Sequence, residues 1–155
     1  MAHYQFTIEI DAPVEVVFDL WTNLDRMREW VGGVTKVTDA TGRLDRAGTR
    51  FTVWFGPMKS PTEVLEVTRP SHFRSRFGNW LLRGENGARF ESIGGRTRLV
   101  QDFRTVGLIP AIMAWIWSRG SYRGSFEGEL REFARLAEGE ARAASDAEAT
   151  DRPVG

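Results

Sequence analysis

The sequence predicts an α+β domain in which a seven-stranded antiparallel sheet packs against one long C-terminal helix. Seven segments with strand-like patterns follow one another at intervals of about 8 to 14 residues, and turn signals separate them. Residues 108–138 then carry apolar side chains at helical spacing over about eight turns. A sheet with one apolar face needs a cover, and this helix is the only predicted element large enough to provide it.

The first strand is followed by two short predicted helices. Residues 4–10 alternate apolar and polar side chains, which is typical of a half-buried strand. Pro13 suits the first position of a helix, and residues 14–22 carry one apolar stripe. Asn23 is a suitable cap for the second short helix, which the two glycines at 32–33 end.

The six remaining strands are predicted to follow one another as a meander. Turn signals such as Gly56-Pro57, Arg69-Pro70 and the two-residue hairpin signal Gly94-Gly95 lie between them. Short connections join antiparallel neighbours, because parallel neighbours need a crossover of about a dozen residues or more. The expected strands are residues 34–40, 49–55, 61–68, 72–79, 81–92 and 96–106.

The predicted C-terminal helix combines an apolar stripe with three glycines. Gly120, Gly124 and Gly128 lie four residues apart beside the stripe, although each costs about 1 kcal/mol relative to alanine in a helix interior. We expect close packing within the monomer at these glycines, with room for a ligand or a helix–helix contact as the alternatives. The stripe itself consists of Leu108, Ile112, Trp115, Phe126, Leu130, Phe133 and Ala137.

We expect a single domain over residues 1–139 and a flexible tail over residues 140–155. A chain of 155 residues has the length of one domain, and 41% hydrophobic residues suffice for a sizeable core. The final residues are rich in alanine, serine and acidic side chains and show no apolar periodicity.

The composition excludes several functional classes. Lys+Arg and Asp+Glu both number 21, so no net charge indicates a nucleic-acid or anionic-membrane partner. The absence of cysteine excludes disulfides and thiolate metal sites. The N-terminus lacks the pattern of a signal peptide, and the apolar run 108–117 is about half a membrane span. We therefore expect a cytoplasmic monomer or homodimer without stable membrane insertion and without a nucleic-acid partner.

Four sequence segments, taken together in their order and spacing, resemble a known family. Residues 10–18, Ile-Asp-Ala-Pro-Val-Glu-Val-Val-Phe, are similar to its opening pattern I-x-A-P-x-E-x-V-F. Leu24-Asp25 with Glu29-Trp30, residues 64–70 and residues 94–99 are similar to its later segments. On these motifs the chain resembles the START/birch-pollen-allergen-like (SRPBCC) superfamily, and within it the polyketide cyclase/dehydrase and lipid-transport family.

The resemblance implies a helix-grip fold, in which a curved sheet wraps around the C-terminal helix and leaves a cavity between them. Members of the family typically bind a hydrophobic small molecule or lipid there. We therefore expect this protein to bind a small hydrophobic, lipid- or polyketide-like molecule without a cofactor. The alternatives are a cofactor-free polyketide cyclase/dehydratase that uses the same cavity and a protein-interaction module with Met113 and Trp117 on its partner surface.

Arg119 is the strongest anomaly in the predicted helix, because helical phase places it near the centre of the apolar stripe. Burial of an unpaired guanidinium is very unfavourable. We hypothesise that Arg119 and Tyr122 orient a ligand carboxylate or phenolate, and they are the only residues assignable to catalysis. In the simpler interpretation the helix bends at Gly120, and Arg119 and Arg123 pair with surface acids.

The inward faces of the predicted strands supply further candidates for a ligand site. Gln101 shares a strand face with Leu99 and Phe103, and a buried amide needs hydrogen-bond partners. Two histidines, His3 and His72, are too few and too far apart to predict a metal site. Most inward aromatic residues should be ordinary core. The predicted ligand-binding residues are Trp30, Phe51, Val53, Phe55, Phe73, Phe90, Gln101, Phe103, Ile116, Arg119, Tyr122 and Arg123.

Overall fold

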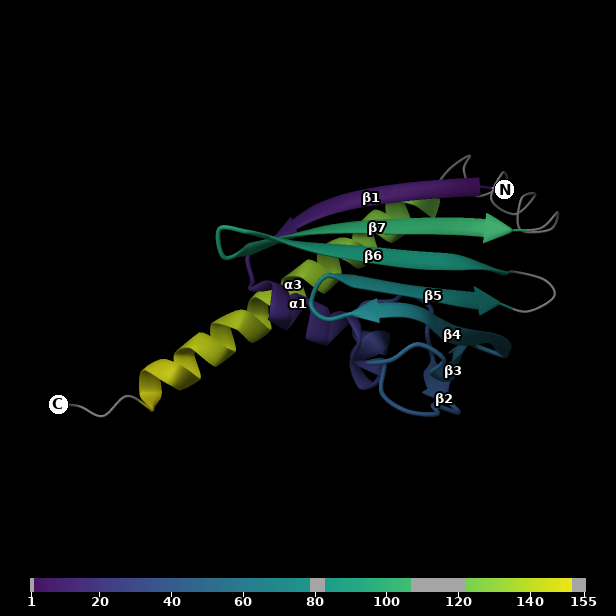
Figure 1. Ribbon diagram of the computed structural model, residues 1–155, viewed down its shortest axis with the longest axis horizontal. Coiled ribbons are helices and arrows are strands. Elements are labelled where there is room, and N and C mark those ends of the chain that lie inside the picture. Colours follow the sequence, from purple (N-terminus) through teal and green to yellow (C-terminus); the bar gives the residue numbers. More distant parts are fainter. Residues whose placement is uncertain (1, 79–82, 107–121, 152–155) are drawn as a thin grey trace.

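The computed structural model describes residues 2–78, 83–106 and 122–151, with the backbone alone at 2, 106 and 122–126. The described elements follow the order that the sequence predicts (Figure 1). They are β1 (Ala2–Ile10), α1 (Val14–Trp21), the 3-10 helix η1 (Leu24–Glu29), β2 (Lys36–Thr38), β3 (Arg50–Phe55), β4 (Met58–Thr68), β5 (His72–Gly78), β6 (Arg83–Ile93), β7 (Arg96–Val106) and α3 (Tyr122–Thr150).

The seven strands form one antiparallel sheet in the order β1-β7-β6-β5-β4-β3-β2. From β2 to β7 each strand pairs with its neighbour in the chain, which confirms the predicted meander. Gly94 and Gly95 both have positive φ values, 57° and 81°, and turn the chain between β6 and β7. β1 closes the other edge by pairing with β7 along its whole length.

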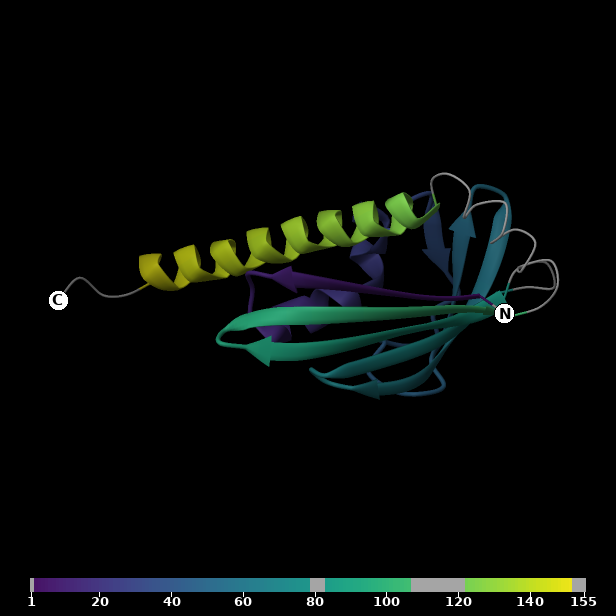
Figure 2. The same ribbon diagram turned by 90° about the horizontal axis from the view of Figure 1, so that it is seen from above.

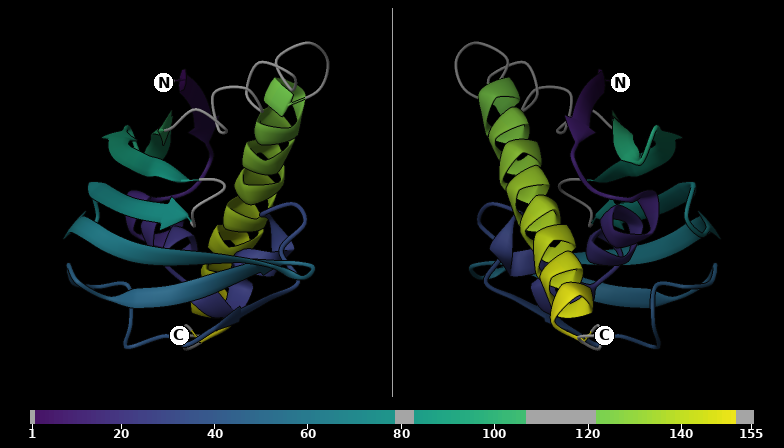
Figure 3. Two further views of the ribbon diagram at one scale, coloured as in Figure 1. Left: turned by 90° about the vertical axis from the view of Figure 1, so that its right-hand side faces the viewer. Right: turned by 90° about the vertical axis from the view of Figure 1, so that its left-hand side faces the viewer.

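Helix α3 crosses the concave side of the sheet, and the strands curve around it (Figures 2 and 3). Leu130, Phe133 and Ala137 are buried, as their positions on the predicted stripe require. Phe133 has no exposed surface, and its ring meets the rings of Trp21 and Trp30. The core therefore lies between this helix, α1 and the inner face of the sheet.

The C-terminal end of α3 corrects one boundary from the sequence. The helix continues to Thr150 instead of ending at Glu138, and its last residues extend past the sheet (Figure 2). Residues 142–150 are exposed, so helix propensity and not burial maintains this part, which is rich in alanine. The expected flexibility of residues 140–155 stays a prediction, and the predicted start at Leu108 lies outside the described residues.

Two other predictions need adjustment near the second strand. β2 is limited to Lys36–Thr38, shorter than the predicted strand over residues 34–40. The segment after Gly56, in contrast, turns immediately into β4, which begins at Met58 and not at Pro61. Gly128 also differs from expectation, because an added Cβ there would meet no atom of the described residues within 4 Å. Close packing against the described residues therefore does not explain this glycine, and the side-chain surroundings of Gly120 and Gly124 lie outside them.

Candidate functional site

A cavity of about 370 Å³ lies between the concave face of the sheet, η1 and α3. Its walls come from almost every element of the fold, which places the site where the helix-grip architecture predicts it. The described residues that line it are Trp21, Met27, Trp30, Val31, Gly32, Leu44, Phe51, Val53, Phe55, Met58, Ser60, Thr62, Phe73, Ser75, Phe77, Asn86, Gln101, Phe103 and Glu129.

Most of the wall is apolar because alternate residues of each strand point inward. On β3 these are Phe51, Val53 and Phe55, and the rings of Phe77 on β5 and Phe103 on β7 stack in the same wall. Their ring centroids are 5.2 Å apart with 19° between the planes. Such surfaces favour apolar ligands, since each square ångström of apolar surface removed from water contributes about 25 cal/mol.

A band of neutral polar side chains crosses the sheet within this apolar wall. Ser75 on β5 stands directly opposite Asn86 on β6, and Thr62 on β4 and Gln101 on β7 extend the band to either side. The Gln101 amide donates a hydrogen bond from Nε2 to Asn86 Oδ1 at 3.2 Å. The band can therefore both donate and accept hydrogen bonds without carrying a charge.

Glu129 is the one charged residue among the described lining residues. Its Oε1 accepts a hydrogen bond of 3.0 Å from the backbone N–H of Gly32, in the loop after η1. Burial raises the pKa of the Glu129 carboxyl from 4.5 to about 7, and the hydrogen bond from Gly32 opposes part of this rise. Near neutral pH the cavity therefore contains a carboxyl group that exchanges readily between its protonated and ionised forms.

Trp30, another lining residue, lies in a cluster of aromatic rings. The centroid of its ring lies 4.8 Å from that of Trp21 and 4.9 Å from that of Phe133. Phe133 follows Glu129 by one turn of α3. The indole Nε1 of Trp30 is buried and has no hydrogen-bond acceptor in the described part of the chain. The cluster is therefore packed mainly by ring contacts, with one unsatisfied donor.

The structure brings together seven of the predicted ligand-binding residues. Phe90 does not belong to this group, since its ring packs against Phe18 and Trp21 in the core, with centroids 5.2 Å and 5.9 Å away. Ile116 and Arg119 lie outside the described residues, as do Met113 and Trp117 and the side chains of Tyr122 and Arg123. The seven that line the cavity are Trp30, Phe51, Val53, Phe55, Phe73, Gln101 and Phe103.

Apart from Gln101, sequence reasoning missed the polar part of the wall. Glu129 precedes Phe133 by four residues, so the helical period places both on one face. Ser75 has the same strand parity as Phe73, and Asn86 the same parity as the buried Ala88. The periodicity that identified apolar residues as inward could therefore have identified these polar residues too.

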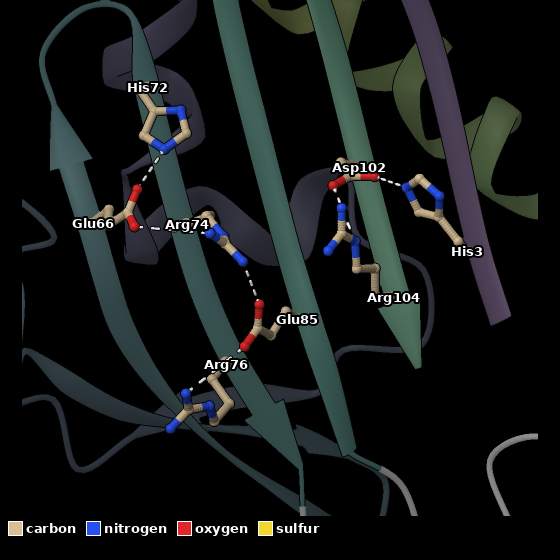
Figure 4. Close-up of polar contacts among 8 residues, drawn as sticks. All are labelled: His3, Glu66, His72, Arg74, Arg76, Glu85, Asp102 and Arg104. Carbon is tan, nitrogen blue, oxygen red and sulfur yellow. Dashed lines mark hydrogen bonds and ion pairs between the residues drawn. The ribbon is translucent and has the colours of Figure 1, made fainter. Parts of the chain in front are cut away.

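The two histidines belong to the outer face of the sheet and not to the cavity (Figure 4). His72 contacts Glu66 at 3.0 Å, and His3 contacts Asp102. Further ion pairs lie on this outer face. Arg104 lies 3.6 Å from Asp102, and Arg98 lies 3.5 Å from Glu9 and 3.9 Å from Glu91.

The described residues show neither a metal-binding cluster nor a helix that could span a membrane. No group of three or more His, Asp or Glu side chains there is arranged to hold a metal ion. None of the described helices has a stretch that is both long and apolar enough to serve as a transmembrane span.

Several solved structures share this fold at low sequence identity. A Helicobacter pylori protein has a TM-score of 0.74 at 12% identity, over 88% of each chain. The Aha1 dimer from Colwellia psychrerythraea has a TM-score of 0.65 at 14% identity, over 89% of this chain and 97% of that one. DynU16, described as a protein of the dynemicin biosynthetic locus, has a TM-score of 0.66 at 18% identity. The match to DynU16 covers 88% of this chain but 47% of DynU16, so this chain spans about half its length.

Sequence comparison identifies the family, whereas these structural likenesses establish the fold alone. Comparison with curated proteins found no match. The family model described as polyketide cyclase/dehydrase and lipid transport matches residues 1–140. This range includes every strand and most of α3. The chain therefore belongs to the polyketide cyclase/dehydrase and lipid transport family of the SRPBCC superfamily.

Proposed function

We propose that this protein binds one small, mainly apolar molecule, lipid-like or polyketide-like, in the cavity between the sheet and α3. The observation that carries the proposal is the cavity itself, about 370 Å³ in volume and lined mainly by aromatic and aliphatic side chains. Small-molecule sites in proteins typically have volumes of about 300 to 1,000 Å³ with a few polar groups in an apolar wall. The band from Thr62 to Gln101 and the Glu129 carboxyl match that description.

A fluorescence titration with N-phenyl-1-naphthylamine, a neutral apolar dye, tests this proposal. The wild-type protein should bind the dye saturably. Val53→Phe should weaken binding because a larger ring would occupy part of the cavity. Thr52→Phe is the matched control, since the neighbouring residue points to the outer face of β3 and does not line the cavity. Absence of saturable binding, or equal weakening by both substitutions, would count against the proposal.

The cyclase/dehydratase alternative gains support from Glu129. A carboxyl group with a pKa of about 7 in an apolar cavity can accept a proton from a substrate carbon or return one near neutral pH. Exchange of the α protons of 1-tetralone for deuterium provides a simple test. Saturable exchange by the wild-type protein that Glu129→Gln abolishes would favour an enzyme, whereas exchange at the buffer rate would leave binding as the function.

A further inference from the structure

The polar groups of the cavity indicate which kind of ligand it accepts, provided that the proposed binding function holds. The described lining residues include one acidic side chain and no Lys, Arg or His. A ligand carboxylate placed among these residues would therefore lose its hydration without gaining a cationic partner. It would also share the cavity with the Glu129 carboxylate, and like charges at short distance repel each other.

Glu129 contacts the loop after η1 through its carboxyl group. Gly32 donates its backbone N–H to Oε1, and a Cβ added at Gly32 would lie 3.0 Å from the same oxygen. The bare backbone of this glycine therefore lets the carboxyl group approach the loop. A carboxylate offers about four acceptor positions, and among the described residues the Gly32 N–H occupies one of them.

We propose that Glu129 is a specificity-determining residue that selects neutral ligands with a hydrogen-bond donor, such as a phenol or an alcohol, and rejects carboxylates. A ligand hydroxyl donates to the Glu129 carboxylate, while the apolar body of the ligand contacts the aromatic wall. The neutral amides of Asn86 and Gln101 accommodate further oxygens of the same ligand. The raised pKa of Glu129 agrees with this assignment, because it reports how poorly the surroundings solvate a negative charge.

This selectivity is opposite to the one expected from the Arg119 hypothesis. If Arg119 orients a ligand carboxylate, carboxylates should bind best. If Glu129 sets the preference, they should bind worst. Probes that share one ring system and differ in one substituent separate the two outcomes.

Isothermal titration of the full chain at pH 8 with naphthalene, 2-naphthol and 2-naphthoate provides the test. A phenol ionises at a pKa of about 10 and a carboxylic acid at about 4, so only the naphthoate is charged. A hydrogen bond to a charged acceptor should make 2-naphthol bind about tenfold more tightly than naphthalene to the wild-type protein. The naphthoate should bind most weakly of the three.

The variant Glu129→Gln should weaken 2-naphthol binding about fivefold, because a neutral acceptor replaces a charged one, and should strengthen naphthoate binding. Opposite changes for two probes are not expected from general damage to the fold. Glu148→Gln, at an exposed position on the same helix, is the matched control and should change neither affinity.

Tighter binding of naphthoate than of 2-naphthol by the wild-type protein would overturn the proposal. An unchanged ratio of the two affinities in Glu129→Gln would overturn it too. Naphthalene binding without any preference for 2-naphthol would remove this inference and leave the proposed binding function intact. Failure of all three probes to bind would remove both.

Discussion

Replacement of Glu129 by glutamine should stabilise the protein above neutral pH. The folded protein holds the proton of this carboxyl group more tightly than the unfolded chain, since its pKa is raised from 4.5 to about 7. Glu129 therefore makes its full contribution to the stability of the folded state below the unfolded pKa of 4.5. This contribution is lost as the pH rises through the folded pKa of about 7. Glutamine keeps an acceptor for the Gly32 N–H and removes the charge.

The pKa change sets an upper limit on the effect. One pH unit corresponds to about 1.4 kcal/mol, so the interval from 4.5 to about 7 corresponds to at most about 3.4 kcal/mol at pH 8. Partial exposure of the side chain reduces this figure, and we expect about 1 to 2 kcal/mol after screening by solvent. For a chain of this length, such a gain raises Tm by about 2 to 8 °C.

Thermal unfolding of the wild type, Glu129→Gln and Glu148→Gln at pH 5 and pH 8 measures the effect. The advantage of Glu129→Gln over the wild type should be small at pH 5 and should grow at pH 8. Comparison of each variant with the wild type at the same pH isolates the contribution of residue 129. A Glu129→Gln protein that is equally stable or less stable than the wild type at pH 8 would refute the reasoning, as would the same gain in Glu148→Gln.

Two glycine substitutions should have opposite effects on the free energy of unfolding in urea. Gly84→Ala should lower the free energy of unfolding by about 2 to 3 kcal/mol, because the new Cβ would collide with the Arg104 carbonyl and lie 2.9 Å from Phe77 Cζ. A loss below about 0.5 kcal/mol would contradict this packing. Gly128→Ala should gain about 0.5 to 1 kcal/mol, because no described residue would lie within 4 Å of the new Cβ and alanine is the better helix former. A loss of stability would show that the glycine is needed.

Local sequence patterns predicted most of the fold. Strict alternation around Phe51 and Phe73 identified β3 and β5, and the glycines at 94–95 identified the hairpin between β6 and β7. Apolar periodicity was less informative for exposed segments, whose conformation does not depend on packing against the core. The exposed end of α3 near Thr150 carries no apolar stripe, so periodicity could not reveal that alanine-rich sequence continues the helix.

The candidate site was predicted in its apolar part and, among its polar residues, only at Gln101. Inward aromatic residues such as Phe55 and Phe103 follow from strand parity and line the cavity. Strand parity cannot, however, distinguish a residue of the cavity wall from a residue of the solid core. Phe90, for example, points inward but packs against Phe18 and Trp21. That distinction depends on how the sheet curves around α3, which is a property of the whole fold.

The role of Glu129 could be recognised only in the three-dimensional structure. Helical phase alone places it beside Phe133, but an acidic residue at such a position is equally compatible with a solvated helix edge. Its contact with Gly32 joins residues 97 positions apart in the chain. The burial that raises its pKa likewise arises only in the folded structure.

Native mass spectrometry of freshly purified protein tests the central claim, that the cavity holds a small apolar molecule, most directly. The wild type should carry an additional small mass that denaturation removes, and Val53→Phe should carry less of it. Addition of 2-naphthol should displace the retained molecule, and with it the additional mass, if the two compounds occupy the same cavity. A bare chain in both proteins, with no uptake of N-phenyl-1-naphthylamine afterwards, would contradict the account.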